Sequence, residues 1–252
     1  MSDPIPAATL VLFRETGSGP AEHLFVERAA TMKFAAGAIV FPGGRVEPGD
    51  RHMAAAYPDY DADDAAARIC AIRESIEEGG IGAGLSPAPD LAVTERLRAG
   101  LEAGTVFSDL LAAEHLSLDL DALVPFARWR PNFPEARVFD TRFYLARVDA
   151  AAPAARVDET ENVRLFWATA QQVIDQADAG QVTIIFPTRR NLERLASLGS
   201  FEAAQAQAAS LTCPPPMITP FIEERGGVQH LCIPDSFGYP VTSEAMSNVR
   251  RG

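Results

Sequence analysis

Five runs of apolar residues, rich in Leu, Val, Ile and Phe, predict the β-strands of this chain. They cover residues 8–14, 23–28, 36–41, 138–148 and 163–168. The first two are separated by a turn-forming segment and are expected to form a strand pair. The third ends at Pro42-Gly43-Gly44, where we expect a loop with unusual backbone angles.

The strongest helix prediction covers residues 61–78. Acidic residues stand at its start, its interior is rich in Ala, and Gly79-Gly80 ends it. Apolar residues recur at helical spacing and form one stripe: Ala65, Ile69, Ile72 and Ile76. Helices are also predicted at 171–179, at 188–198 and, broken near Gly100 and Gly104, within 90–123.

The length of 252 residues predicts a single domain spanning residues 1–252. The segment at about 90–123 is interpreted as a helical insertion. A C-terminal extension at about 212–252 contains two apolar runs, 217–222 and 228–233, on either side of a Glu-Arg-Gly-Gly turn. A β-hairpin is the simplest prediction for these two runs.

The composition is that of an ordinary globular protein, with 47% apolar and 22% charged residues. No apolar run approaches the roughly 18 residues needed to span a bilayer, and no basic region precedes the first apolar run. We therefore expect a cytoplasmic protein without a membrane partner. The net charge of -12 argues against nucleic acid as a partner. A small molecule is the expected partner, and it can be a polyanion if a metal ion bridges it to the protein.

Three carboxylates on the 61–78 helix are the main chemical feature of the sequence. Glu74, Glu77 and Glu78 stand at positions i, i+3 and i+4, so they share one helix face, roughly opposite the isoleucine stripe. Oxygen ligands favour a hard cation such as Mg²⁺, which suggests metal-assisted attack on a phosphorus centre. The alternative interpretation of three glutamates is a solvated helix face.

The residues around these glutamates resemble the signature of the Nudix hydrolases, G-x5-E-x7-R-E-U-x-E-E-x-G-U, where U is usually aliphatic. Gly44 matches the first Gly, and residues 73–81 match the second half, with Ser75 at the first U. Asp50 stands where the family has Glu, and residues 51–72 replace the x7 spacer, so the segment at about 51–64 is interpreted as an insertion inside this signature. A similarly interrupted box occurs in the coenzyme A diphosphatase branch, and the resemblance to that branch covers most of residues 8–198.

The resemblance implies an α/β/α sandwich around a mixed sheet and dependence on Mg²⁺ or Mn²⁺. It implies Glu74, Glu77 and Glu78 as metal ligands, together with the Gly44 carbonyl. Arg73 would pair with Glu77 and Asp50 and orient the carboxylates. The general base would be Glu74, or else Glu159 or Glu161 of a later loop.

The same resemblance implies hydrolysis of the pyrophosphate of a nucleoside diphosphate derivative. Coenzyme A or its acyl esters are the first expectation, because a basic residue, Lys33, precedes Gly37 and the FPGG segment at the spacing of the coenzyme A group. Lys33, Arg28, Gly43 and Glu161 are the predicted substrate-binding residues. Arg130 and Arg142 are further candidates for the 3′-phosphate, and Trp129, Phe133 and Trp167 for adenine stacking or core packing.

Two other functions stay open at this point. One is hydrolysis of another nucleotide derivative, such as ADP-ribose or NADH, and the other is a Nudix-fold module that binds a ligand without catalysis. Because Nudix proteins often form dimers, a homodimer is also an expectation from the resemblance.

Overall fold

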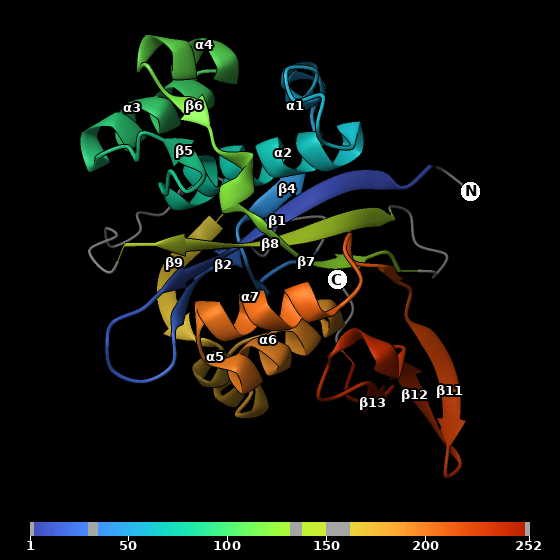
Figure 1. The fold of residues 1–252 in the computed structure, drawn as a ribbon. Coiled ribbons are helices and arrows are strands. Elements are labelled where there is room, and N and C mark those ends of the chain that lie inside the picture. The colour runs from blue at the N-terminus through green and yellow to red at the C-terminus, as the bar shows by residue number, and fades with distance from the viewer. Residues whose placement is uncertain (1–2, 30–34, 132–137, 150–161, 250–252) are drawn as a thin grey trace.

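The computed structural model describes residues 3–29, 35–131, 138–149 and 162–249 (Figure 1). Eight strands form one sheet. They are β1 (Ile5–Arg14), β2 (Glu22–Arg28), β3 (Ile39–Val40), β4 (Gly43–Arg45), β7 (Val124–Trp129), β8 (Phe139–Val148), β9 (Asn162–Thr169) and β10 (Met217–Ile218). The sheet order is β10-β7-β8-β1-β2-β3, with β4 also paired to β1 and β9 to β2.

Both strand orientations occur in this sheet. The central pair β1 and β8 is parallel over ten residues, from Ile5 opposite Phe139 to Arg14 opposite Val148, and β10 is parallel to β7. The pairs β1–β2, β1–β4, β2–β3, β2–β9 and β7–β8 are antiparallel. The predicted mixed sheet is therefore confirmed.

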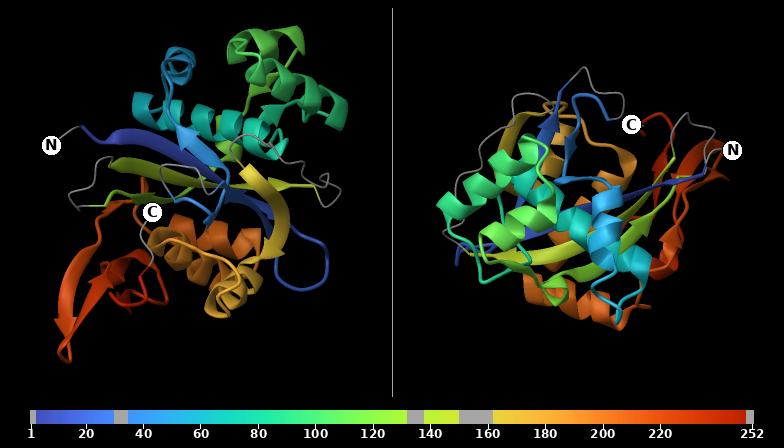
Figure 2. Two further views of the ribbon diagram at one scale, coloured as in Figure 1. Left: turned by 180° about the vertical axis from the view of Figure 1, so that it is seen from behind. Right: turned by 90° about the horizontal axis from the view of Figure 1, so that it is seen from above.

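Helices cover both faces of the sheet (Figures 1 and 2). On one side lie α1 (Pro48–Ala54), α2 (Ala62–Gly79), α3 (Leu91–Glu102) and α4 (Phe107–Ala113). On the other side lie α5 (Ala170–Asp178), α6 (Phe186–Leu198) and α7 (Phe201–Ser210). This arrangement confirms the predicted α/β/α sandwich.

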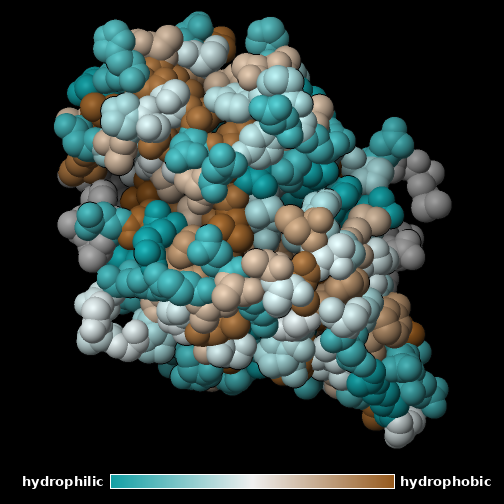
Figure 3. Space-filling view, viewed as in Figure 1, coloured by the Kyte–Doolittle hydropathy of each residue, from teal (hydrophilic) through white to brown (hydrophobic). Residues whose placement is uncertain are grey.

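Smaller elements complete the structure. The strands β5 (Leu85–Ser86) and β6 (Ser117–Leu118) form a two-stranded sheet, and η1 (Leu120–Ala122) and η2 (Asp235–Phe237) are short 3₁₀ helices. A third sheet projects at the C-terminal side (Figures 1 and 3). It consists of β11 (Phe221–Arg225), β12 (Val228–Cys232) and β13 (Ser243–Ala245).

Alternate residues of β1 pack into different hydrophobic layers. Leu10 and Leu12 are fully buried in the cluster that includes α2, whereas Val11 and Phe13 belong to the cluster that includes α6 and α7. Successive side chains of a strand point to opposite faces, so a strand covered on both sides is apolar at nearly every position. This explains why the first apolar run shows no polar alternation.

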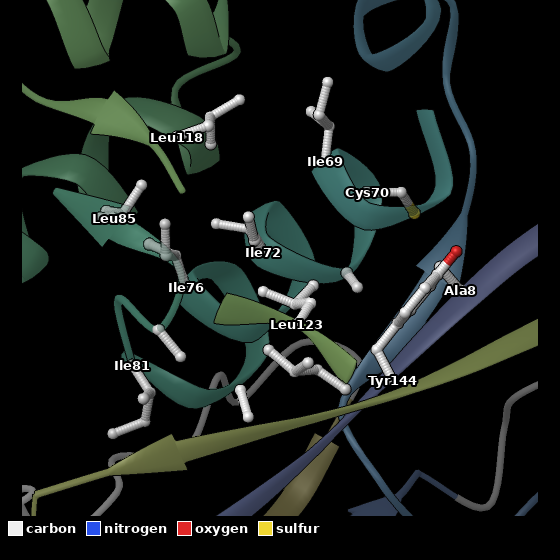
Figure 4. Packing of buried hydrophobic residues seen from close by; sticks show 14 of the residues in the cluster. Ala8, Ile69, Cys70, Ile72, Ile76, Ile81, Leu85, Leu118, Leu123 and Tyr144 are labelled. Carbon is white, nitrogen blue, oxygen red and sulfur yellow. The ribbon is translucent and has the colours of Figure 1, made fainter. Parts of the chain in front are cut away.

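The helix α2 buries its isoleucines against the segment around residues 84–123. Ile69, Ile72 and Ile76 are fully buried, and Figure 4 shows them packed among the leucines of the neighbouring segments. The Asp61 side chain accepts a hydrogen bond from the Asp64 backbone and caps the helix start. Gly80 ends the helix in the left-handed conformation, with φ of 63°. The predicted helix and its stripe are confirmed.

The structure corrects the prediction at several elements. β7 and α7 were not expected, and Gly43–Arg45 is a short strand beside β1 rather than a loop. In the C-terminal segment β11 and β12 form the predicted hairpin, but residues 217–218 leave it and pair in parallel with β7 in the main sheet.

Glycine 100 has a different role from the one expected. The helix α3 continues through Gly100 to Glu102 rather than breaking there. A Cβ atom at this position would lie 2.4 Å from a methyl carbon of Leu110 on α4. The glycine therefore permits close packing of α4 against α3, and the chain turns afterwards at Gly104, where φ is 79°.

His23 generates a prediction about pH and stability. This side chain on β2 is 2% exposed, and its Nδ1 lies 3.0 Å from the Leu12 carbonyl oxygen. Burial lowers the pKa of His23 from 6.5 to about 4, against the opposing effect of the Leu12 hydrogen bond. Between pH 6.5 and about pH 4, His23 binds a proton in the unfolded chain but not in the folded one. The His23 contribution therefore destabilises the fold as the pH falls through this range.

We expect the free energy of unfolding of the wild type, relative to that of His23→Gln, to fall by up to about 1.4 kcal/mol per pH unit within this window. Urea denaturation of both proteins at pH 7, 6 and 5 measures this difference. A difference that does not change with pH would contradict the assignment of a neutral buried imidazole.

Candidate functional site

The candidate site lies where the strand β4 passes the C-terminal half of α2. The backbone N–H of Gly43 donates to Glu78 Oε2 at 2.9 Å. Gly44 packs directly against Glu74, because a Cβ atom at Gly44 would lie 2.2 Å from Glu74 Oε1. Two carboxylates of one helix turn are thus held against two adjacent glycines, and a side chain at position 44 would displace the Glu74 carboxylate.

Arg73 connects all parts of this site. Its Nε and Nη2 donate to the two carboxylate oxygens of Asp50, each at 3.0 Å. Its Nη1 donates to Glu74 at 2.9 Å and to Glu77 at 2.8 Å, and Nη2 also donates to the Arg45 carbonyl oxygen at 3.1 Å. The predicted contacts of Arg73 with Asp50 and Glu77 are confirmed.

Asp50 forms the buried end of this network. It is 2% exposed, and besides the Arg73 guanidinium it accepts the backbone N–H of Glu47 at 2.8 Å as part of the capping box that begins α1. The shorter side chain therefore still reaches Arg73 with both oxygens. This pairing fixes α1 and the preceding β4 relative to α2.

Burial and mutual repulsion change the acidity of the glutamates. The pKa of Glu74 is raised to about 8 by burial and by the charges of Glu78 and Glu77, although Arg73 opposes the shift. The pKa of Glu77 is raised mainly by burial. The side chains of Glu74 and Glu77 are only 13% and 29% exposed. The carboxylates of Glu74 and Glu77 are therefore largely enclosed rather than part of a solvated helix face.

The donor set fits a hard divalent cation in chemistry and charge. All the side-chain donors are carboxylate oxygens, and the repulsion that raises the pKa of Glu74 would become attraction beside a cation. Within the described part of the chain, however, no three acidic, His or Cys side chains converge in a ready-made metal site. Glu74 and Glu77 point instead to Arg73, and Glu78 to Gly43.

The other candidate residues separate into three groups. Lys33, Phe133, Glu159 and Glu161 lie outside the described residues. Arg142 is paired with Asp64 at 3.0 Å, so it serves the start of α2. Trp129 is a core residue, 2% exposed, whereas the ring of Trp167 is covered by the Arg14 guanidinium at 4.2 Å.

Arg28 is the candidate cation with an unmet hydrogen-bonding group. Its backbone N–H donates to the Ala38 carbonyl at 3.1 Å at the end of β2. Its buried Nε has no hydrogen-bond partner among the residues that the structure describes. No hydrogen bond joins it to the carboxylates of α2 in this part of the chain.

Two buried residues of α2 support the site, although no role was predicted for them there. The Ser75 hydroxyl is fully buried and lies 2.9 Å from the Ile72 carbonyl oxygen and 2.7 Å from that of Ile81. It thereby fastens the helix end next to the glutamates. The Cys70 thiol lies 3.2 Å from the Arg45 carbonyl oxygen, and burial raises its pKa. The small polar residue at an otherwise aliphatic signature position was the available signal for Ser75.

The α/β/α sandwich described above is also found in solved structures of other proteins. The chain is 28% identical to a NUDIX hydrolase from Alicyclobacillus acidocaldarius, whose crystal structure superposes with a TM-score of 0.71. The match covers 82% of this chain and 97% of that one. No family model matches the sequence.

Two curated relatives match as well. The chain is 27% identical to nudix hydrolase 7 of Caenorhabditis elegans over 78% of its length, and 26% identical to the acyl-coenzyme A diphosphatase NUDT19 of Gallus gallus over 72%. The matched part spans 63% of the length of each relative. The chain belongs to the Nudix hydrolase superfamily.

Removal of the Arg73 charge tests how far the site depends on this residue. In Arg73→Gln the buried carboxylate of Asp50 loses its partner, and we expect the free energy of unfolding to fall by about 3–5 kcal/mol. Arg96→Gln is the control, because it breaks an exposed Arg96–Glu114 pair and should leave stability almost unchanged. Urea denaturation distinguishes the two, and equal stability of both variants would contradict the buried network.

Proposed function

We propose that this chain is a divalent-metal-dependent hydrolase that cleaves the pyrophosphate of a nucleoside diphosphate derivative. Its first candidate substrates are coenzyme A and acyl-coenzyme A. The products would then be 4′-phosphopantetheine, or its acyl form, and adenosine 3′,5′-bisphosphate. The name of the Gallus gallus relative, an acyl-coenzyme A diphosphatase, supports this choice of substrate.

The observation that carries the proposal is the packing of Glu74 and Glu78 against Gly44 and Gly43. A surface helix needs no such contacts, and a purely structural acidic cluster would be balanced by as many cations. Here one guanidinium, that of Arg73, faces Glu74, Glu77 and the buried Asp50. The excess negative charge and the all-oxygen donor set favour a divalent cation as the missing partner.

The residues that would hold the cation are Glu74, Glu77, Glu78 and the Gly44 carbonyl. A bound divalent cation supplies charge neutralisation for the pyrophosphate and a water of lowered pKa. Glu74 is the preferred general base, since its carboxylate lies within this group of ligands, and Glu159 or Glu161 is the alternative. Arg73 would keep the carboxylate of Glu74 in position through its hydrogen bond to Oε1.

A cation for the 3′-phosphate is needed if the substrate is coenzyme A. Arg28 is favoured over Arg142, since the Nε of Arg28 is buried without a partner in the described chain whereas Arg142 is paired with Asp64. Lys33 would be the second cation. Hydrolysis of ADP-ribose or NADH needs no such partner, so these compounds are the comparison substrates.

The proposed reaction is tested by product analysis. The protein is incubated with coenzyme A, acetyl-coenzyme A, ADP-ribose and NADH in the presence of Mg²⁺ or Mn²⁺. We expect adenosine 3′,5′-bisphosphate from the coenzyme A substrates, at least a 100-fold loss of rate in Glu78→Gln, and no product with EDTA. Cleavage of only ADP-ribose or NADH would reject the substrate, and cleavage of none would leave a ligand-binding module.

The two glycines provide a matched pair of substitutions. In Gly44→Ala the new methyl group meets the movable Glu74 carboxylate, so we expect nearly unchanged stability and about 10- to 100-fold slower hydrolysis. In Gly43→Ala the methyl group would lie 2.5 Å from the Ala8 carbonyl oxygen and 2.8 Å from the Thr9 Cα, so we expect a loss of about 1–3 kcal/mol in stability.

Thermal denaturation and steady-state rates of both variants check this contrast. Full activity of Gly44→Ala would contradict the role of Glu74. A Gly43→Ala protein as stable as the wild type would contradict the close approach of β4 to β1.

A further inference from the structure

A cavity lies on the opposite face of the sheet from α2. Its volume is about 250 Å³, and it is bounded by β7, α6, α7, the segment that follows α7, and η2. Apolar walls come from Phe126, Leu211, Pro216, Ile218 and Phe237, and hydroxyl groups from Ser210, Thr212 and Ser236. None of these residues belongs to the candidate Nudix site.

Arg194 of α6 lines this cavity and is 1% exposed. Its Nε donates to Gln207 at 2.7 Å, its Nη1 donates to the Phe126 carbonyl at 3.0 Å, and its guanidinium stacks over the Phe126 ring at 3.8 Å. The neutral Tyr239 side chain also lies beside the guanidinium, with its ring centroid at 5.1 Å. The buried Nη2 has no hydrogen-bond partner, and no carboxylate forms an ion pair with Arg194 within the described ranges. A buried cation with only neutral neighbours is costly.

The polar group next to Arg194 is also incompletely satisfied. The hydroxyl of Tyr239, a residue that also lines the cavity, accepts from Trp129 and donates to the Asn191 side-chain oxygen at 2.7 Å. The Asn191 Nδ2 is buried without a partner in the part of the chain that is described, but Asn191 does not line the cavity. The unmet donor that belongs to a lining residue is therefore that of Arg194, and the partner it lacks is an acceptor.

We propose that this cavity is a binding site for a small carboxylate with an apolar body, whose carboxylate group binds the Arg194 guanidinium. A carboxylate supplies the charge and the acceptor oxygens that Arg194 lacks, in the planar geometry that matches a guanidinium. The aliphatic or aromatic remainder would lie against Phe126, Ile218 and Phe237.

Charge and size favour a carboxylate over a phosphate. Among the described residues that line the cavity, Arg194 is the sole charged one. One cation balances one negative charge, whereas a phosphate monoester carries nearly two. The volume is below that of most drug-sized sites, so a ligand the size of octanoate is appropriate.

Isothermal titration of the full chain with octanoate tests the proposal, with octanol and inorganic phosphate as comparison ligands and without divalent metal. We expect one octanoate per chain, a rise in melting temperature, and at least tenfold weaker binding of octanol and phosphate. No octanoate binding at millimolar concentration, or equal binding of octanol, would overturn the proposal.

Two alanines of α7 give a matched pair of variants that leave Arg194 intact. Ala208 is buried and lines the cavity, so Ala208→Leu should fill it and weaken octanoate binding at least tenfold. Ala206 is exposed on the same helix, and Ala206→Leu should bind as the wild type does. Circular dichroism and melting curves establish that both variants are folded. Unchanged octanoate binding in a folded Ala208→Leu would show that the ligand binds elsewhere and overturn the proposal.

Discussion

The buried guanidinium of Arg73 is the interaction on which the candidate site depends. It joins the glutamates of α2 to two elements that precede this helix in the sequence, through Asp50 at the start of α1 and the Arg45 carbonyl of β4. Lysine could not replace it, because the contacts use a planar fork with donors on three nitrogens. Since Asp50 is almost fully buried, the charge of Arg73 is needed for folding as well as for positioning Glu74.

The sheet separates two regions with different chemistry. On the α2 side, carboxylates outnumber the one arginine that orders them, and the excess favours a cation. On the α6 and α7 side, Arg194 is buried without an acidic partner among the described residues, and this favours an anion. The strand β1 contributes Leu10 to one hydrophobic layer and Val11 to the other, so the same strand supports both regions.

The sequence was sufficient to predict the sandwich, α2 and the residues that meet around Arg73. The sandwich and the pairing of Arg73 with Asp50 follow from the resemblance to the Nudix signature. The helix α2 and its acidic face depend on local signals, namely the Asp61 cap, the isoleucine stripe, and the fixed spacing of Arg73, Glu74, Glu77 and Glu78. Long-range contacts could not be predicted in this way. The pairing of residues 217–218 with β7 and the enclosure of Glu74 by Gly44 are set by tertiary packing, which leaves no local pattern.

The most direct test of this account is Mn²⁺ binding, measured by electron paramagnetic resonance of the free ion. The account predicts saturable binding to the wild type and at least tenfold weaker binding to Glu74→Gln and Glu78→Gln. Glu95→Gln, on the exposed face of α3, should bind as the wild type does. Equal Mn²⁺ affinity of the wild type and the two α2 variants would contradict the claim that these glutamates form a metal site.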